Sequence, residues 1–449
     1  MKLHPGYYVA VFGGAVAGSQ AADLLAKRGI YTAVFEQNTL PYGKIEDGLP
    51  KWHVKLRDKE ERKTDQRLSQ DYVQFIPKTA LGREVSFKEI VQDWGFSAVL
   101  LAIGSWRDRP LPVEGVDEYV GKGLYYQNPF VEWFNHHHEP NYRGEHFEIK
   151  DDAIVVGGGL ASIDVVKIVM LETTQRALAE RGFNEDILTL EREGIPRVLE
   201  RLNLSFEDLG IKGCTLYYRR RIQDMPLSSL PPGATPEQME KVYKVRIKIL
   251  ENARRKYLFR VKDLNRPVDK IVENGRLAGL VFQKTRVENG RVVGIEGSEF
   301  EVRSPLVISS IGSIPKPIEG IPMEWELYKI KDKNTGELEG YPGVFALGNT
   351  VTGKGNIRES ELHSRKVVQH VLDNYLKWSE VDFRDFQEAL SEGKPLPEPT
   401  NSAWRSTEEI EKINRRIREA QKRVGYDGNY RKWIEEHKPV RLEEMIPAR

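Results

Sequence analysis

Residues 7–18 read YYVAVFGGAVAG, and this stretch decides the fold of the first part of the chain. The run YYVAVF is β-prone and is followed at once by a turn that contains Gly13, Gly14 and Gly18. The next residues, SQAADLLAKRG, predict a helix that ends at Gly29, and YTAVFE then predicts a second strand. This order of strand, glycine turn, helix and strand indicates a βαβ unit.

An acidic residue, Glu36, stands at the end of the second strand of this unit, about 20 residues past the turn. A glycine turn lets the backbone approach a pyrophosphate, and the following helix offers free N–H groups and a favourable dipole. The Glu36 carboxylate can accept hydrogen bonds from an adenosine ribose, which suits a cofactor with a free 2′-hydroxyl such as FAD or NAD. Ala15 replaces the middle glycine of the pattern. The alternative is a turn that only connects a strand to a helix.

The same order recurs in the middle of the chain. Residues 152–156, DAIVV, lead into the turn GGGLAS and then into a long helical stretch. After an insertion rich in Glu, Arg and Leu, the strand CTLYY ends at three arginines, Arg219, Arg220 and Arg221. The guanidinium groups of Arg219 and Arg220 would pair with a 2′-phosphate, which favours NADPH over NADH. The alternative is a solvated basic loop.

The bulk composition narrows the possible classes of protein. The 68 basic and 67 acidic residues of the 449 nearly cancel, so no overall field favours nucleic acid or an anionic membrane. No apolar run reaches the roughly 18 residues of a membrane span, and we expect a soluble cytoplasmic protein. Cys214 is the one cysteine. A single cysteine excludes an intrachain disulfide, a redox-active CxxC pair and a cysteine-ligated cluster held by this chain.

The sequence predicts an α/β protein with two nested Rossmann-like dinucleotide-binding domains and a helical C-terminal extension. Strand-to-glycine turns at Gly104 and Gly312 are the expected crossings between the domains. We expect a discontinuous FAD domain over 1–108 and 315–376 and an NADP domain over 109–314. Residues 377–449 have a different composition, with the linker-like PLPEPTNS at 395–402 and a charged amphipathic helix after it. They are expected to form a charged appendage.

Three further segments carry a family resemblance. PYGKIEDGLPKWH contains Pro41-Tyr42-Gly43, then Gly48 and His53; GGGLASID ends at Asp164; and YYRRRIQDMP follows the second unit. With these motifs, roughly residues 7–376 resemble the adrenodoxin-reductase-like ferredoxin–NADP reductases, which are relatives of the glutamate synthase small subunit. The sequence departs from the family pattern at Val16, Leu160 and Asn349.

The resemblance extends the set of candidate site residues. His53 and Asp164 are candidate catalytic groups, as polar contacts near the flavin and the nicotinamide, and Gly355, Asn356 and Ile357 resemble the segment against which the flavin ring packs. The expected FAD contacts are Gly13, Gly14, Ala15, Gly18, Glu36, Gly43, Gly48, Gly104, Gly348, Asn349, Gly355 and Ile357, and the expected NADP contacts are Gly157, Gly159, Ser162, Arg219 and Arg220.

The chemistry that this resemblance implies is hydride transfer from NADPH to FAD. The single cysteine leaves no dithiol or internal cluster to receive the electrons, so they must pass to an external acceptor. The family implies a one-electron carrier such as ferredoxin. Two alternatives stay open: an NADPH-oxidising electron-input subunit of a larger enzyme, and a non-catalytic nucleotide-binding scaffold.

Two other stretches have possible binding roles. Residues 240–262 carry nine Lys or Arg against two Glu, which indicates either a solvated surface or a docking surface for an acidic redox protein. We expect no nucleic-acid binding there. The run His136, His137 and His138 cannot direct all its rings to one metal from a regular element, so we predict an exposed loop and no metal site.

Overall fold

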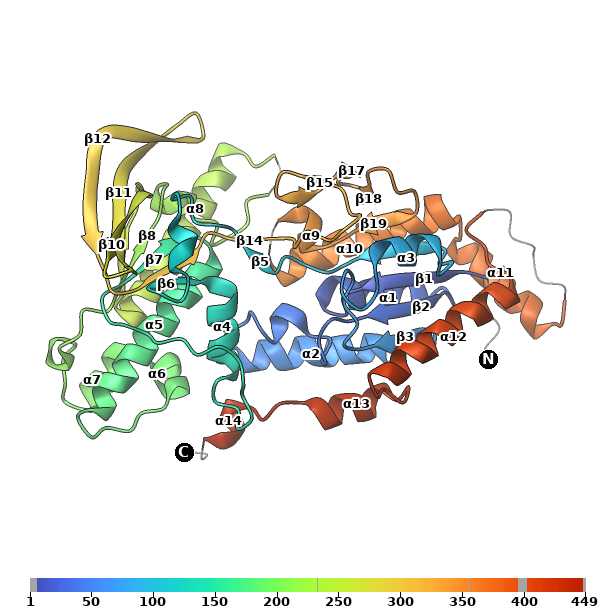
Figure 1. The fold of residues 1–449 in the computed structure, drawn as a ribbon, viewed down its shortest axis with the longest axis horizontal. Coiled ribbons are helices and arrows are strands. Elements are labelled where there is room, and N and C mark those ends of the chain that lie inside the picture. The colour runs from blue at the N-terminus through green and yellow to red at the C-terminus, as the bar shows by residue number, and fades with distance from the viewer. Residues whose placement is uncertain (1–5, 232, 354, 395–401, 447–449) are drawn as a thin grey trace. The chain divides into compact units, whose positions relative to one another are not determined.

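The computed structural model describes residues 6–231, 233–353, 355–394 and 402–446, and the chain divides into two compact units (Figure 1). Unit 1 comprises Met1–Leu49, His53–Arg107 and Ser313–Pro439. Unit 2 comprises Pro50–Trp52, Asp108–Gly312 and Val440–Arg449. Each unit contains one of the two glycine turns. The part of the expected linker at 395–401 lies outside the described residues.

Unit 1 is built on a seven-stranded sheet with the order β17-β18-β19-β4-β1-β2-β3, in which β19, β4, β1, β2 and β3 are parallel. Its strands are β1 (Tyr8–Phe12), β2 (Tyr31–Phe35), β3 (Val73–Ile76), β4 (Ala98–Leu101), β17 (Ile330–Asp332), β18 (Glu337–Leu338) and β19 (Val344–Ala346), with a separate hairpin of β15 (Met323–Glu324) and β16 (Leu327–Tyr328). Its helices are α1 (Val16–Ala26), α2 (Val54–Leu68), α3 (Phe87–Gln92), α9 (Asn349–Thr352), α10 (Ile357–His370), α11 (Glu380–Ser391), α12 (Thr407–Arg423) and α13 (Tyr430–His437).

Alternating side chains of β1 place a separate apolar core on each face of this sheet. Val9 and Val11 belong to the core that includes side chains of α1 and α10, whereas Tyr8, Ala10 and Phe12 belong to the core that includes side chains of α3 and α12. The five residues of β1 are all buried. A parallel strand with helices over both faces shows such a continuous apolar run because neither face meets water.

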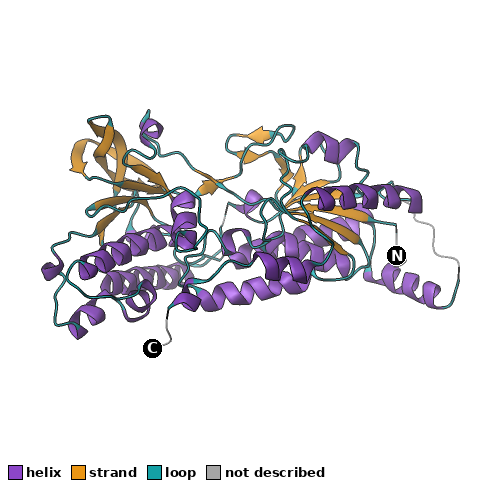
Figure 2. Ribbon diagram, turned by 60° about the horizontal axis from the view of Figure 1, so that its bottom comes forward, coloured by secondary structure: helices purple, strands orange, loops and turns teal. Residues whose placement is uncertain are grey.

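Unit 2 repeats this plan with a five-stranded parallel sheet of order β6-β13-β7-β8-β9 (Figure 2). One face meets the helices, and the other meets a three-stranded antiparallel sheet, β10-β11-β12, through Leu277, Leu280 and Phe282. The strands are β6 (Leu124–Tyr126), β7 (Ala153–Gly157), β8 (Cys214–Tyr217), β9 (Arg260–Lys262), β10 (Asn265–Glu273), β11 (Arg276–Glu288), β12 (Arg291–Arg303) and β13 (Val307–Ser310). The helices are α4 (Gln127–His136), α5 (Leu160–Ala179), α6 (Ile187–Glu193), α7 (Ile195–Arg201), α8 (Pro236–Tyr257) and α14 (Leu442–Met445).

The predicted α/β fold with a helical C-terminal segment is confirmed, but the C-terminal segment is not a separate appendage. Ile410, Ile413 and Ile417 of α12 are buried in the core of unit 1, and α12 packs beside β3. Asn414 accepts hydrogen bonds from the Tyr8 hydroxyl at 3.0 Å and from the Gln74 side chain at 2.8 Å. The charged residues of α12 lie on its solvent side, which explains why composition alone indicated an exposed segment.

Two smaller expectations can be compared with the structure. The histidine run is not exposed: His136 ends α4, His137 and His138 lie in the turn after it, and all three are partly buried. The His137 ring stacks on Trp133 with ring centroids 4.6 Å apart. Among the described residues, no group of three or more His, Cys, Asp or Glu side chains is arranged to hold a metal ion. Within the same ranges, no helix combines the length and apolar character that a membrane span requires.

Candidate functional site

The carboxyl ends of four parallel strands, β1, β2, β4 and β19, meet at one edge of the sheet of unit 1. Ligands of parallel α/β sheets bind outside this edge. Four of the predicted FAD contacts directly follow these strands or lie a few residues beyond them: Gly13, Glu36, Gly104 and Gly348. The topology therefore gathers residues that are far apart in the sequence.

The first glycine turn is held by close backbone contacts. A Cβ atom on Gly18 would lie 1.7 Å from the carbonyl oxygen of Gly13, so α1 approaches β1 at a distance that only glycine permits. Gly13 has a φ of +96°, and a Cβ atom there would lie 2.5 Å from the carbonyl oxygen of Ala102. Ala15 has φ −71° and ψ −151°, a backbone conformation that does not require glycine. This explains how Ala15 replaces the middle glycine without strain.

No side chain caps the N-terminus of α1, and its first-turn N–H groups face the same edge of the sheet. An uncapped helix N-terminus after a glycine turn is the arrangement that receives a phosphate. The turn thus fits the pyrophosphate of a dinucleotide. Gly43, φ +51°, lies against it, since a Cβ atom on Gly43 would be 3.0 Å from that of Ala15.

Glu36 is 3% exposed at the end of β2. Its carboxylate accepts hydrogen bonds from the backbone N–H groups of Gly14 at 2.8 Å and Asn38 at 2.9 Å. Burial raises the pKa of Glu36 to about 7, although these two backbone donors oppose the shift. A carboxylate with two oxygens retains capacity for further donors, such as the hydroxyls of a ribose.

The segment after β19 supplies the other end of the site in unit 1. Gly348, φ +72°, donates its N–H to Nδ1 of His363 at 3.1 Å, and Nε2 of His363 lies 3.1 Å from the carbonyl oxygen of Lys333. Burial lowers the pKa of His363, which agrees with a neutral ring that accepts at one nitrogen and donates at the other. His363 was not predicted from the sequence, because a single histidine in a helix carries no recognisable pattern.

The side chain of Asn349 offers an acceptor for a ligand in unit 1. Its Oδ1 atom is buried and has no hydrogen-bond partner among the described residues. Buried polar atoms are nearly always paired, so this oxygen fits a ligand donor such as a ribityl hydroxyl of FAD. The backbone oxygens of Asn349 and Gly104 are joined to neighbouring side chains, the first to Ser105 at 3.4 Å and the second to Thr350 at 3.5 Å. The turns after β4 and β19 are therefore packed together.

The remaining FAD candidates lie in two turns of unit 1. Gly355 is exposed, and Ile357 begins α10, whose N-terminus is capped by the Asn356 side chain accepting from the Glu359 N–H at 2.8 Å. Gly48 lies close to Lys44, where a Cβ atom would be 3.0 Å from that of Lys44. His53 is half-buried and immediately precedes α2. Its catalytic role stays a prediction.

In unit 2, the second glycine turn lies at the carboxyl ends of β7, β8 and β13. A Cβ atom on Gly157 would lie 2.2 Å from the Ser162 hydroxyl, and one on Gly158 would lie 2.2 Å from the Tyr218 ring. Gly159 faces open space, and no side chain caps α5, which begins just after it. The turn therefore presents free backbone N–H groups on its open side, as a pyrophosphate site requires.

Ser162 and Asp164 of α5 have partners within unit 2. The buried Ser162 hydroxyl donates to the carbonyl oxygen of Ser310 at 2.9 Å, so this side chain fixes the turn to β13. Asp164 lies 3.9 Å from the ammonium group of Lys167, which also forms an ion pair with Glu191 at 3.1 Å. The contacts of both residues with a bound nicotinamide nucleotide stay predictions.

The three arginines after β8 are not equivalent. Arg221 makes a two-point ion pair with Asp224, with both N–O distances 3.0 Å, and Arg220 donates to the carbonyl oxygen of Gly290 at 2.9 Å. The exposed Arg219 side chain has no hydrogen bond or ion pair within the part of the chain that the structure describes. Arg219 is therefore the arginine best able to bind a phosphate without losing another contact.

Comparison with known proteins agrees with these two turns. Residues 7–192, which contain both, match the pyridine nucleotide-disulphide oxidoreductase family. This match covers less than half of the chain. The chain is 25% identical over 355 residues to the mitochondrial NADPH:adrenodoxin oxidoreductase of Arabidopsis thaliana, covering 71% of this chain and 70% of that protein.

A second relative matches a smaller part of the chain, and a solved structure matches its fold. The chain is 29% identical over 168 residues to the glutamate synthase [NADPH] small chain of Bacillus subtilis, a match that covers 37% of this chain and only 33% of that one. FprA from Mycobacterium tuberculosis, solved in complex with NADPH, superposes with a TM-score of 0.65 at 19% identity and covers 93% of this chain and 90% of its own. The chain therefore shares the fold of FprA.

The raised pKa of Glu36 predicts that FAD binding depends on pH. Ribose hydroxyls that donate to Glu36 favour its ionised form, so below about pH 7 binding must remove a proton. We expect FAD to bind the apoprotein about five- to tenfold more tightly at pH 8 than at pH 6, measured by quenching of flavin fluorescence. The Glu36→Gln variant should lose this dependence, and an equally steep pH profile in the variant would show that Glu36 is not responsible.

Proposed function

We propose that this protein is an NADPH-dependent flavoprotein reductase that passes electrons from NADPH through FAD to a separate carrier protein. When bound, FAD accepts a hydride from the nicotinamide and releases the electrons to an acceptor. One observation carries the proposal: the two glycine turns end in opposite chemistry, a buried carboxylate at Glu36 in unit 1 and an unpaired guanidinium at Arg219 in unit 2.

The residues of unit 1 fit FAD. The uncapped α1 and the first turn receive the pyrophosphate, Glu36 accepts from the adenosine ribose, and the unpaired Oδ1 of Asn349 accepts from the ribityl chain. The backbone at the start of α10 lies in the segment that the family resemblance assigns to the flavin ring. These groups orient the cofactor by hydrogen bonds. Glu36, the one ionisable side chain among them, is buried.

The residues of unit 2 fit NADPH. The turn at Gly157–Gly159 receives the pyrophosphate, and Arg219 and Arg220 bind the 2′-phosphate that distinguishes NADPH from NADH. An exposed arginine keeps its hydration until the phosphate arrives, so recognition does not require a charge to be buried in the free protein. The relatives named NADPH:adrenodoxin oxidoreductase and glutamate synthase [NADPH] small chain support this choice.

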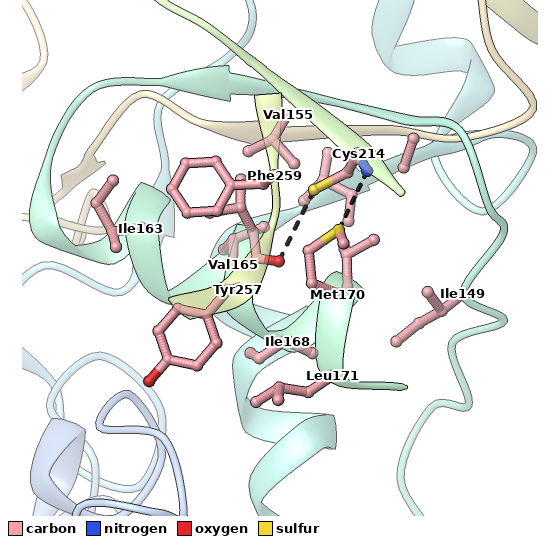
Figure 3. Close-up of a cluster of buried hydrophobic side chains, with 14 of the residues drawn as sticks. Ile149, Val155, Ile163, Val165, Ile168, Met170, Leu171, Cys214, Tyr257 and Phe259 are labelled. Carbon is pink, nitrogen blue, oxygen red and sulfur yellow. Dashed lines mark hydrogen bonds between the residues drawn. The ribbon is translucent and has the colours of Figure 1, made fainter. Parts of the chain in front are cut away.

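The lone thiol does not offer an exit for the electrons. Cys214 is fully buried in the apolar core of unit 2, where its Sγ lies 3.8 Å from the carbonyl oxygen of Val166 (Figure 3). Burial raises the pKa of this thiol well above its usual range, which keeps it protonated and unreactive. The electrons therefore leave to another molecule, and the relatives favour a ferredoxin-like carrier.

The basic stretch 240–262 supplies a docking surface for that carrier in this proposal. Lys241, Lys244 and Lys248 recur at helical spacing along α8, all three are exposed, and the exposed Val245 lies among them. Lys244 also pairs with Glu240 at 2.7 Å, whereas Lys241 and Lys248 have no ion pair among the described residues. Elsewhere in the stretch, buried Arg246 donates to the Ser228 carbonyl oxygen, and Arg260 binds Asp152. The available positive charge is therefore concentrated on one side of α8, opposite in sign to an acidic partner.

A second candidate function is supported by the glutamate synthase match. The protein would then be an electron-input subunit that oxidises NADPH for a partner enzyme. Both functions require the same two cofactors in this chain. Purification from the native source distinguishes them, because a subunit elutes with its partner enzyme.

The presence of flavin is the decisive test of the proposed function. We expect the purified protein to be yellow, with FAD released on denaturation, and to bleach when NADPH is added without oxygen, as followed by flavin absorbance. A colourless protein that takes up no FAD on reconstitution would exclude a redox role and leave a nucleotide-binding scaffold.

Arg219 is expected to discriminate between the two nicotinamide nucleotides. The Arg219→Ala variant should weaken NADPH binding by about tenfold or more, because it removes charge-assisted hydrogen bonds worth roughly 1.5–3 kcal/mol, and should change NADH binding less than twofold. Titration of each nucleotide measures this difference. Arg197→Ala, which removes an exposed arginine of α7, is the control for lost charge. Equal losses for NADPH and NADH in Arg219→Ala would contradict the assignment to the 2′-phosphate.

The docking surface predicts a defect that salt removes. Replacing Lys241, Lys244 and Lys248 by Gln should slow reduction of an acidic ferredoxin about tenfold at low ionic strength, while NADPH-dependent ferricyanide reduction is unchanged. The difference should vanish in roughly 0.5 M salt because the charges are then screened. The control replaces three exposed cations of α12, Lys412, Arg415 and Lys422, by Gln. The same slowing in the control would assign the effect to net charge rather than to α8.

A further inference from the structure

The loop of residues 37–43 in unit 1 connects Glu36 to the Pro41-Tyr42-Gly43 segment, and one side of it lies against the first glycine turn. A Cβ atom on Gly14 would be 2.8 Å from the Cβ atom of Pro41, and one on Gly43 would be 3.0 Å from that of Ala15. Asn38 donates its N–H to Glu36 at 2.9 Å. Any displacement of this loop therefore moves the turn or the carboxylate.

The opposite side of the loop is held by the C-terminal helix α13. The indole Nε1 of Trp433, a residue only 6% exposed, donates to the carbonyl oxygen of Thr39 at 2.8 Å. The Trp433 ring is itself fixed, with His437 stacked on it at 3.8 Å between ring centroids and the Lys78 ammonium group 5.3 Å from its centre. A rigid donor of this kind restricts the loop at its middle residue.

A second contact between α13 and the loop passes through Asp65 of α2. The Tyr430 hydroxyl donates to the Asp65 carboxylate at 2.8 Å, and the Tyr42 hydroxyl donates to the same carboxylate at 3.0 Å. Both tyrosines are buried, and the Tyr430 ring packs edge-on against Phe75 of β3. Asp65 thus joins α13 to the end of the loop that touches Ala15.

We propose that α13 is a clasp that fixes loop 37–43 over the first glycine turn and thereby sets the affinity for FAD, with Trp433 and Tyr430 as positioning residues. This inference rests on the proposed function of unit 1 as the FAD site. Trp433 acts on the turn through Thr39, and Tyr430 acts through Asp65 and Tyr42. Holding the loop in its binding conformation before the cofactor arrives removes part of the ordering cost of binding.

The experiment compares two tryptophans that are matched in burial and bonding. Trp433→Phe keeps an aromatic ring but removes the donor to Thr39. Trp378→Phe does the same to another tryptophan of unit 1, 7% exposed, whose Nε1 donates to the Arg28 carbonyl at 3.1 Å, beyond the far end of α1. Affinity for FAD is measured by fluorescence titration of the full-length apoprotein, and its resistance to urea is measured in parallel.

We expect Trp433→Phe to weaken FAD binding about five- to tenfold and Trp378→Phe to leave it within twofold, with similar small losses of urea resistance in both, since each loses one buried hydrogen bond. NADPH binding should not change in either. Tyr430→Phe, which removes only one hydroxyl, should also weaken FAD binding, and it serves if Trp433→Phe does not fold. Unchanged FAD affinity in Trp433→Phe and Tyr430→Phe, or an equal loss in Trp378→Phe, would overturn the clasp. A wild-type protein that binds no FAD would instead overturn the proposed function.

Discussion

The close approach of Gly18 to the carbonyl oxygen of Gly13 is the constraint on which unit 1 depends. The N-terminus of α1 can lie this close to the end of β1 only because Gly18 has no side chain. A methyl group at Gly18 would lie 1.7 Å from that oxygen. A similarly close contact occurs at Gly348, where a Cβ atom would be 2.7 Å from that of Ala17. Strands β1 and β19 therefore both end beside α1, and the residues that follow the two strands lie close together.

In unit 2, the contact between the glycine turn and the helix after it involves a hydroxyl group. The Ser162 side chain occupies the space beside Gly157 and donates to the Ser310 carbonyl, so a hydrogen bond fixes the relation of turn, helix and neighbouring strand. The two units differ most in the polar group beyond their second strand. Glu36 is buried with backbone donors around it, whereas Arg219 stays in solvent. The first arrangement suits neutral hydroxyls and the second suits a doubly charged phosphate.

Much of this site was predictable because its signals are local. The glycine turns, the acceptor carboxylate of Glu36 and the donor guanidinium of Arg219 lie within short stretches whose order of elements follows from composition and spacing alone. Partners from distant segments were not predictable in this way. His363 reaches Gly348 only through the packing of α10, and Trp433 reaches Thr39 across most of the chain. For α12 a signal was present, since Ile410, Ile413 and Ile417 form an apolar stripe at helical spacing, but the surrounding charges obscured it.

The hydrogen bond between Tyr8 and Asn414 joins residues that are 406 positions apart, and this has a consequence for synthesis on the ribosome. Most of unit 2, Asp108–Gly312, is one continuous run, so it can fold while the chain is still growing. At roughly 5–20 residues per second, about 20–80 s pass between the synthesis of β1 and that of α12, which packs on its second face. During that interval Tyr8, Ala10 and Phe12 lack the cover of α12, and this face of the nascent sheet is exposed to aggregation.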